Sequence, residues 1–112
     1  KGDYLADLDA DWTVLDRLRY QEISRYSMLQ LAAIYLQEGR AHDCLNIARR
    51  VLQSDSLLEA AHRLIIQAYA SLHDPANMTL QYRQYRQSLE DQLGLQPSLE
   101  ISTLYEQLMA AI

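Results

Sequence analysis

Glycine and proline are scarce in this sequence, with three glycines and two prolines among 112 residues. The sequence also lacks runs of valine, isoleucine and threonine that alternate with polar residues, which is the pattern of a half-buried strand. Few helix breakers and no strand pattern together predict an all-α fold. The apolar runs are too short to cross a bilayer, so we expect no membrane partner.

Cysteine and basic residues are also few. The single cysteine, Cys44, excludes a disulfide within the chain and is typical of a reducing compartment, so we expect a cytoplasmic protein. Acidic residues outnumber Lys and Arg by 15 to 10, and the net charge of −5 argues against nonspecific binding of polyanions. We expect one domain over residues 1–112, with an acidic lead-in at 1–11. Because the chain begins with Lys1 and not with Met, we expect it to be a piece of a longer protein.

No catalytic or metal-binding motif is recognisable in the sequence. It holds no nucleophile elbow, no phosphate-binding loop and no glycine motif for dinucleotides. Three histidines are present, far apart and without the spacing of zinc ligands: His42, His62 and His73. We interpret Cys44 as a small core residue, and Glu59 with Arg63 as a structural ion pair. We expect no enzymatic activity, no metal and no cofactor.

Capping residues and glycines divide the chain into five predicted helices, at about 12–38, 41–54, 56–72, 75–93 and 98–110. Asp9 or Asp11 caps the first helix. Ser56 and Glu59 form a capping box at the start of the third, and Asp74 caps the fourth. Two glycines end helices by allowing a left-handed residue: Gly39 after the first and Gly94 after the fourth.

Tyrosines and arginines interleave in the segment LQYRQYRQSLE at 80–90, a mixture that also occurs on surfaces that bind nucleic acids. Helical spacing separates the two residue types. Four residues share one helical face: Met78, Tyr82, Tyr85 and Leu89. Arg83 and Arg86 lie off that face. We therefore interpret the tyrosines as core residues and the arginines as part of a solvated face.

An internal repeat of about 34 residues runs through the middle of the chain. A shift of 34 aligns five pairs: Leu31 with Ile65, Tyr35 with Tyr69, Gly39 with His73, Cys44 with Met78 and Ala48 with Tyr82. This period, with an aromatic residue before the turn and a small residue after it, is typical of tetratricopeptide (TPR) repeats. We predict a TPR-like right-handed stack of antiparallel helix pairs. A plain five-helix bundle is the alternative.

Three segments of the chain resemble a known family. They are GDYLADLDADW at 2–12, ARRVLQSDSLLEAAHRLIIQAYASLHDP at 48–75 and LQYRQYRQSLEDQLGLQPSLEISTLYEQL at 80–108. Together they are similar to the bacterial transcriptional activator domain (BTAD) of SARP-type transcription factors. The departures from the family pattern fall in turns, where Ser56 replaces a frequent proline and His73 stands near a frequent glycine.

The resemblance implies a noncatalytic regulatory module of a bacterial transcription factor that supports dimerisation, signal coupling or contact with the transcription machinery. Its partners would be proteins: a second copy, adjacent domains of the parent protein or the transcription machinery. DNA would be bound only through a separate winged-helix domain that is absent from this chain. The alternative is a TPR-type peptide-binding adaptor unrelated to transcription.

The repeat register also places candidate partner-binding residues, because the first helix of each pair in a TPR stack lines the concave groove. On the first predicted helix the groove positions are apolar: Tyr26, Leu29, Ala33 and Leu36. On the third they include the polar residues Arg63 and Gln67. Apolar stripes seldom face water without a partner. The apolar stripe either receives a protein or is buried internally, through rotation of its helix or contact with the fifth helix.

Overall fold

The computed structural model describes the backbone of residues 2–112 and the side chains of residues 14–112. The backbone of residues 2–112 forms five helices: α1 (Gly2–Gln37), α2 (Ala41–Ser54), α3 (Glu59–Ser71), α4 (Pro75–Leu93) and α5 (Leu99–Ala111). This confirms the prediction of an all-α fold. The expectations for Asp9, Asp11 and Trp12 concern side chains that lie outside the described part of the chain.

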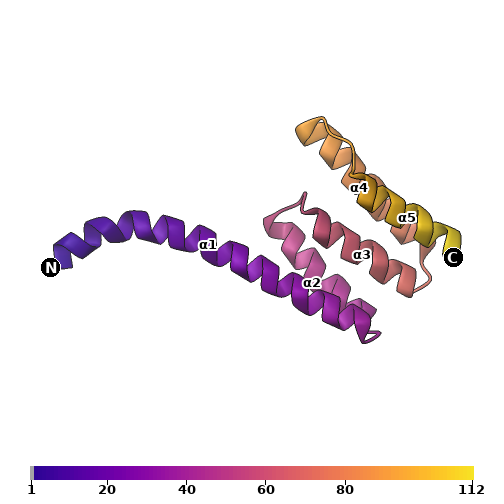
Figure 1. Ribbon diagram of the computed structural model, residues 1–112, viewed down its shortest axis with the longest axis horizontal. Helices are drawn as coiled ribbons and strands as arrows, with labels where there is room; N and C mark the ends of the chain where they lie inside the picture. Colours follow the sequence, from indigo (N-terminus) through magenta and orange to yellow (C-terminus); the bar gives the residue numbers. More distant parts are fainter. Residues whose placement is uncertain (1) are drawn as a thin grey trace.

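The first four helices pack in sequence order, and α3 lies at the centre of the stack (Figure 1). α1 and α2 form an antiparallel hairpin, and α3 packs against α2, α4 and the C-terminal part of α1. α5 packs back onto α3. The molecule is elongated, with extents of 63 × 35 × 18 Å, because the N-terminal part of α1 extends far beyond the other helices (Figure 1).

The 34-residue repeat is present in the backbone geometry of the two inter-helix turns. Gly39 after α1 and His73 after α3 both adopt left-handed backbone conformations, with φ of 78° and 55°. The hydrogen bonds around them also correspond. The Arg40 amide donates to the Tyr35 carbonyl at 2.8 Å, and the Asp74 amide donates to the Tyr69 carbonyl at 3.0 Å. The same helix-ending turn is therefore built twice, once with glycine and once with histidine.

The predicted cap at Asp74 is confirmed, Ser98 caps the predicted fifth helix, and the predicted capping box at Ser56 is wrong. The carboxylate of Asp74 accepts a hydrogen bond from the Asn77 amide, and the hydroxyl of Ser98 accepts one from the Ile101 amide. α3 begins only at Glu59, and its N-terminal flanking residue is Leu58. Ser56 lies in a turn stabilised by Asp55, whose carboxylate accepts from the Leu57 amide at 3.3 Å. The local Asx turn therefore competes successfully with the predicted cap.

The predicted start of the first helix near residue 12 is also wrong, because α1 begins at Gly2. Nothing in residues 3–37 breaks a helix, since this segment contains neither glycine nor proline. The aspartates at 3, 7, 9 and 11 are compatible with the partial positive charge of a helix N-terminus. The acidic segment that we expected to precede the helix therefore forms its first turns.

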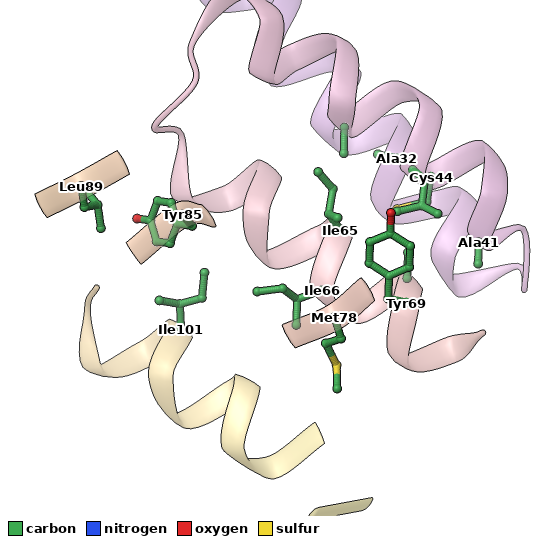
Figure 2. Close-up of a cluster of buried hydrophobic side chains, with 13 residues drawn as sticks. Ala32, Ala41, Cys44, Ile65, Ile66, Tyr69, Met78, Tyr85, Leu89 and Ile101 are labelled. Atoms are coloured by element: carbon green, nitrogen blue, oxygen red, sulfur yellow. The ribbon is translucent and has the colours of Figure 1, made fainter. Parts of the chain in front are cut away.

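The core runs through the stack from α1 to α5 and is built from small and branched side chains. Figure 2 shows Ile65 pointing toward the α1–α2 hairpin and Ile66 toward Ile101 of α5. Cys44 is fully buried, as predicted, and burial raises the pKa of its thiol to about 11. The thiol is thus protonated at neutral pH and serves as a small apolar residue.

The predicted face of α4 is confirmed. Met78, Tyr85 and Leu89 are buried, whereas Arg83 and Arg86 are exposed. Tyr82 is half-buried and stacks on Tyr105 of α5, with ring centroids 4.2 Å apart, and its hydroxyl lies 3.0 Å from the Ser102 hydroxyl. The tyrosines of α4 thus attach it to the rest of the stack, and Tyr82 in particular joins it to α5.

Replacing His73 with glycine should stabilise the chain by about 0.5–1 kcal/mol. A left-handed residue other than glycine costs about 1–2 kcal/mol, and the greater freedom of glycine in the unfolded chain offsets part of the gain. The matched change Gly39→Ala should destabilise by about 1 kcal/mol, since an added Cβ there meets no atom within 4 Å and only backbone strain remains. Urea denaturation of both variants checks the pair. If both substitutions changed the free energy of unfolding in the same direction, the two turns would not be equivalent.

Tyr82→Ala should destabilise the chain by about 2–4 kcal/mol, somewhat less than for a fully buried aromatic residue, because the tyrosine is half-buried. Arg83→Ala, one residue along the same helix, should cost less than about 0.5 kcal/mol because its side chain is exposed. Thermal and denaturant unfolding of the two variants measures the difference. A loss for Arg83→Ala as large as that for Tyr82→Ala would contradict the assignment of the faces.

Candidate functional site

α1 is much longer than the helix that pairs with it. It has 36 residues and α2 has 14, so at 1.5 Å per residue about 33 Å of α1 extends beyond α2. Its described projecting part carries exposed apolar side chains, among them Leu15 (63% exposed), Leu18 (56%) and Ile23 (57%). Apolar residues are also distributed around the helix rather than along one stripe, and a helix with that pattern is usually surrounded by protein. α1 is therefore the first candidate for an interaction surface.

The paired part of α1 has an exposed, mostly apolar face. We define this outer face as Ile23, Ser27, Leu31 and Ile34, all of which are exposed, and the counterparts in α3 of the last three are buried. A shift of 34 residues aligns Leu31 (41% exposed) with Ile65 (0%), and Ile34 (47%) with Ala68 (0%). The two helices thus present similar apolar positions, and only those of α3 are covered.

The apolar positions of α3 that correspond to the outer face are buried by the preceding helix pair, α1 and α2. α3 has α2 along one side and α4 along another. The Cys44 thiol of α2 reaches the Leu64 carbonyl, whereas the His62 ring of α3 lies 4.3 Å from the Tyr85 ring of α4. Ile65 points toward the α1–α2 side (Figure 2). By the same register, the outer face of α1 is the place where a preceding helix would pack.

The groove positions predicted on α1 differ in their environment. Tyr26 is 65% exposed, and Leu29 and Ala33 are half-buried. Leu36 is half-buried and packs against the core cluster. The predicted stripe thus passes from solvent at Tyr26 to the core at Leu36. Partner binding by these four residues stays a prediction.

The polar groove positions of α3 line an open hollow between α3 and α5. Arg63 and Gln67 form one side of it, and Leu99, Thr103 and Leu104 belong to the other. The Arg63 guanidinium pairs with Glu100 of α5 at 2.5 Å and with Glu59 at 3.9 Å. The predicted pair of Glu59 with Arg63 is present, and its partner on α5 was not predicted. The lining of this hollow contains no residue of α1, so Arg63 and Gln67 do not share it with the predicted α1 stripe.

A buried polar network joins the turn before α3 to α4. The Nε2 atom of His62 lies 2.9 Å from the Ser56 carbonyl, and its Nδ1 atom lies 2.9 Å from the Gln81 amide nitrogen. Both ring nitrogens are satisfied if Nε2 donates and Nδ1 accepts, which is the neutral form. Burial lowers the pKa of His62 and outweighs the hydrogen bond to Ser56. The network makes His62 a structural residue of the packed stack.

The described residues offer little for other kinds of site. Within residues 14–112 no three His, Cys, Asp or Glu side chains come together to hold a metal ion. In the same part of the chain, no helix combines the length and hydropathy needed to span a membrane.

The repeat register predicted groove positions on α1, which stay a prediction, and the outer face was not predicted. The signal was present, because the repeat aligns Leu31 with Ile65, and a buried counterpart predicts a surface that needs cover. The repeat alone does not give the burial of either copy, so the difference between Leu31 and Ile65 becomes visible only in the structure.

The fold and its surfaces define a helical repeat module in which the first helix is incompletely covered. Comparison with known families agrees: the family model of the bacterial transcriptional activator domain matches residues 1–109. The chain belongs to this family, which is a regulatory and not an enzymatic one. No curated protein and no solved structure matches the chain.

The stability of the chain should fall as the pH is lowered through the range below about 6.5. Because burial lowers the pKa of His62 in the folded state, the unfolded chain takes up the proton first. The contribution of neutral His62 is therefore complete above the unfolded pKa and is lost as the pH falls through the folded pKa. Midpoints of thermal unfolding between pH 5 and pH 8 measure the effect.

His62→Gln should reduce this pH dependence, and His42→Gln, a change on the exposed surface of α2, should preserve it. Parallel midpoint curves for the wild-type chain and His62→Gln would show that His62 does not cause the effect. Carboxylates titrate mainly below this range, so they contribute little to the comparison.

Proposed function

We propose that this domain is a noncatalytic protein-interaction module of a bacterial transcription regulator, and that its interaction surface is α1. The observation that carries the proposal is the difference between Leu31 and Ile34 on α1, which are exposed, and Ile65 and Ala68 on α3, which are fully buried. A partner helix on the outer face of α1 would repeat the packing of α2 on α3. Membership of the activator-domain family supports the regulatory role.

The projecting half of α1 supports the same proposal. Leu15, Leu18 and Ile23 are each more than half exposed, and each fully buried aliphatic side chain contributes about 1.5–3 kcal/mol relative to exposure. Covering the three would therefore contribute several kcal/mol to binding before the costs of association. The partner is a protein: a second copy, an adjacent domain of the parent regulator or a component of the transcription machinery. We further propose that the module acts in the cytoplasm.

DNA recognition is assigned in this proposal to a separate domain. The chain carries a net charge of −5, and Arg86 is on the exposed face of α4 while Arg63 is neutralised by Glu59 and Glu100. A duplex-binding surface needs several free cations along one face. The module would thus affect transcription through proteins while a winged-helix domain of the parent protein contacts the DNA.

A peptide-binding adaptor is the second candidate, and the hollow between α3 and α5 favours it. Leu99 is 83% exposed beside this hollow, and Arg63 and Gln67 offer polar groups to an extended peptide backbone. The family membership favours the regulatory proposal over this one. A peptide occupying this hollow would leave the outer face of α1 exposed, so the two candidates are separable by mutation.

Changing both Leu31 and Ile34 to Ser should leave the chain folded but reduce its association with proteins about tenfold or more, because two exposed apolar contacts are removed from the centre of the face. Sedimentation velocity measures self-association, and a binding assay with purified bacterial RNA polymerase measures contact with the transcription machinery. Circular dichroism and a melting curve establish that the variant is folded.

Two control variants make this test specific. Ile65→Ser changes the buried counterpart of Leu31 and should unfold or strongly destabilise the chain. Gln30→Ser changes an exposed polar residue of α1 and should alter neither folding nor association. If the Leu31/Ile34 variant unfolds as Ile65→Ser does, the outer face is core and the proposal fails. Unchanged association of a folded double variant with both probes would contradict it as well.

A further inference from the structure

A small hollow lies where α1 leaves the stack, between α1 and the C-terminal end of α2. Its volume is about 280 Å³, and seven residues line it: Tyr20, Gln21, Ser24, Arg25, Met28, Arg50 and Ser54. The lining combines two arginines with three hydroxyl-bearing residues and one amide. A carboxylate is absent from this set of lining residues, although acidic residues outnumber basic ones in the chain.

Both guanidinium groups at this hollow lack an acidic partner among the side chains of residues 14–112. The three ion pairs among the described side chains use Arg40 and Arg63, and no carboxylate of the described residues lies within 4.0 Å of Arg25 or Arg50. Arg25 is half-buried, so part of its cost of desolvation is not offset by a protein anion. Two unpaired arginines beside one hollow make it locally positive in an acidic molecule.

The remaining polar groups are hydrogen-bond donors suited to an oxyanion. The Ser54 hydroxyl donates to the Val51 carbonyl at 3.0 Å, so its proton is already used. The Ser24 hydroxyl, the Gln21 amide and the Tyr20 hydroxyl remain as donors on α1. A phosphate monoester presents three strong acceptor oxygens and close to two negative charges, whereas a carboxylate presents two oxygens and one charge. Two guanidinium groups with three neutral donors fit the phosphate better.

From this geometry we propose that the hollow between α1 and α2 binds a phosphate monoester. Arg25 and Arg50 hold the terminal oxygens from opposite helices, and Ser24, Gln21 and Tyr20 complete the donor set. Met28 and the Tyr20 ring provide an apolar wall against which the organic part of the ligand rests. The partial negative charge at the end of α2 opposes an anion, but it is smaller than the combined attraction of the two arginines.

Binding at this position would fasten two parts of the stack to each other. Tyr20, Gln21 and Ser24 belong to the segment where α1 passes the end of α2, and Arg50 lies near the C-terminus of α2. A bound phosphate bridges these helices and reduces the motion of the projecting half of α1. The site is separate from the outer face, so this inference does not depend on the proposed function.

The test is a titration of the isotope-labelled chain with phenyl phosphate at constant ionic strength, followed through amide NMR shifts. We expect saturable shifts that concentrate in residues 20–28 and 50–54. Inorganic phosphate tests whether the oxyanion alone is recognised, and saturation at the same residues also supports the site. Benzoate tests a carboxylate on the same ring and should bind about tenfold more weakly or not at all, because it has fewer acceptors and less charge.

Arg50→Met and Arg25→Met should each weaken phenyl phosphate binding by about tenfold or more, since each removes charge-assisted hydrogen bonds. Arg49→Met is the matched control, because Arg49 belongs to the same helix and carries the same charge but lies over the Tyr69 ring, 5.6 Å from its centroid. The proposal is overturned if the wild-type chain shows no saturable shifts, if benzoate binds as tightly as phenyl phosphate, or if Arg49→Met weakens binding as much as Arg50→Met. If Arg25→Met fails to fold, binding to Arg50→Met, which changes an exposed residue, and the shift changes of the wild-type chain still decide the outcome.

Discussion

Burial of α3 on both sides is the constraint on which the rest of the structure depends. Ile65 and Ile66 of this helix are both fully buried, and they point in different directions, toward the α1–α2 hairpin and toward Ile101 of α5 (Figure 2). α2, α4 and α5 each pack directly on α3, whereas α1 packs mostly against α2 and reaches α3 with its C-terminal part. The two left-handed turns at Gly39 and His73 place the second helix of each pair back against the first, which makes this arrangement possible.

The same constraint explains why α1 carries the proposed function. α3 is covered by a pair on each side, whereas α1 has a pair on one side only, so positions that repeat the core of α3 are exposed on α1. In a stack of helical repeats each unit contacts its neighbours, and an exposed end retains an apolar surface unless a cap covers it. A regulatory domain can use such an end to receive another protein. The phosphate site proposed at the exit of α1 would then control how firmly the projecting helix is held.

The sequence predicted the helices and their repeat more closely than their ends and surfaces. Gly39, Asp74 and Gly94 act locally, and the turns and the cap that they predicted are present. The capping box at Ser56 failed because the Asp55 turn and the hydrogen bond from His62 to the Ser56 carbonyl hold that residue outside the helix. The register predicted groove positions but not their environment: the partial burial of Leu36 follows from its packing against the core cluster, and the pairing of Arg63 with Glu100 depends on where α5 packs. The outer face can be recognised only by comparing the burial of equivalent residues in the two repeat copies. Sequence periodicity alone does not give that burial.

Native-state hydrogen exchange of the chain tests the central claim, that α3 is the anchor of the stack and the projecting part of α1 is uncovered. It should be measured at a concentration where sedimentation gives a monomer. The account predicts that the amides of α3 exchange most slowly, at rates set by global unfolding, while those of residues 14–23 exchange through local opening orders of magnitude faster. Equal protection of residues 14–23 and α3 in the monomer would contradict it, because the projecting segment would then have to be stabilised within the chain itself.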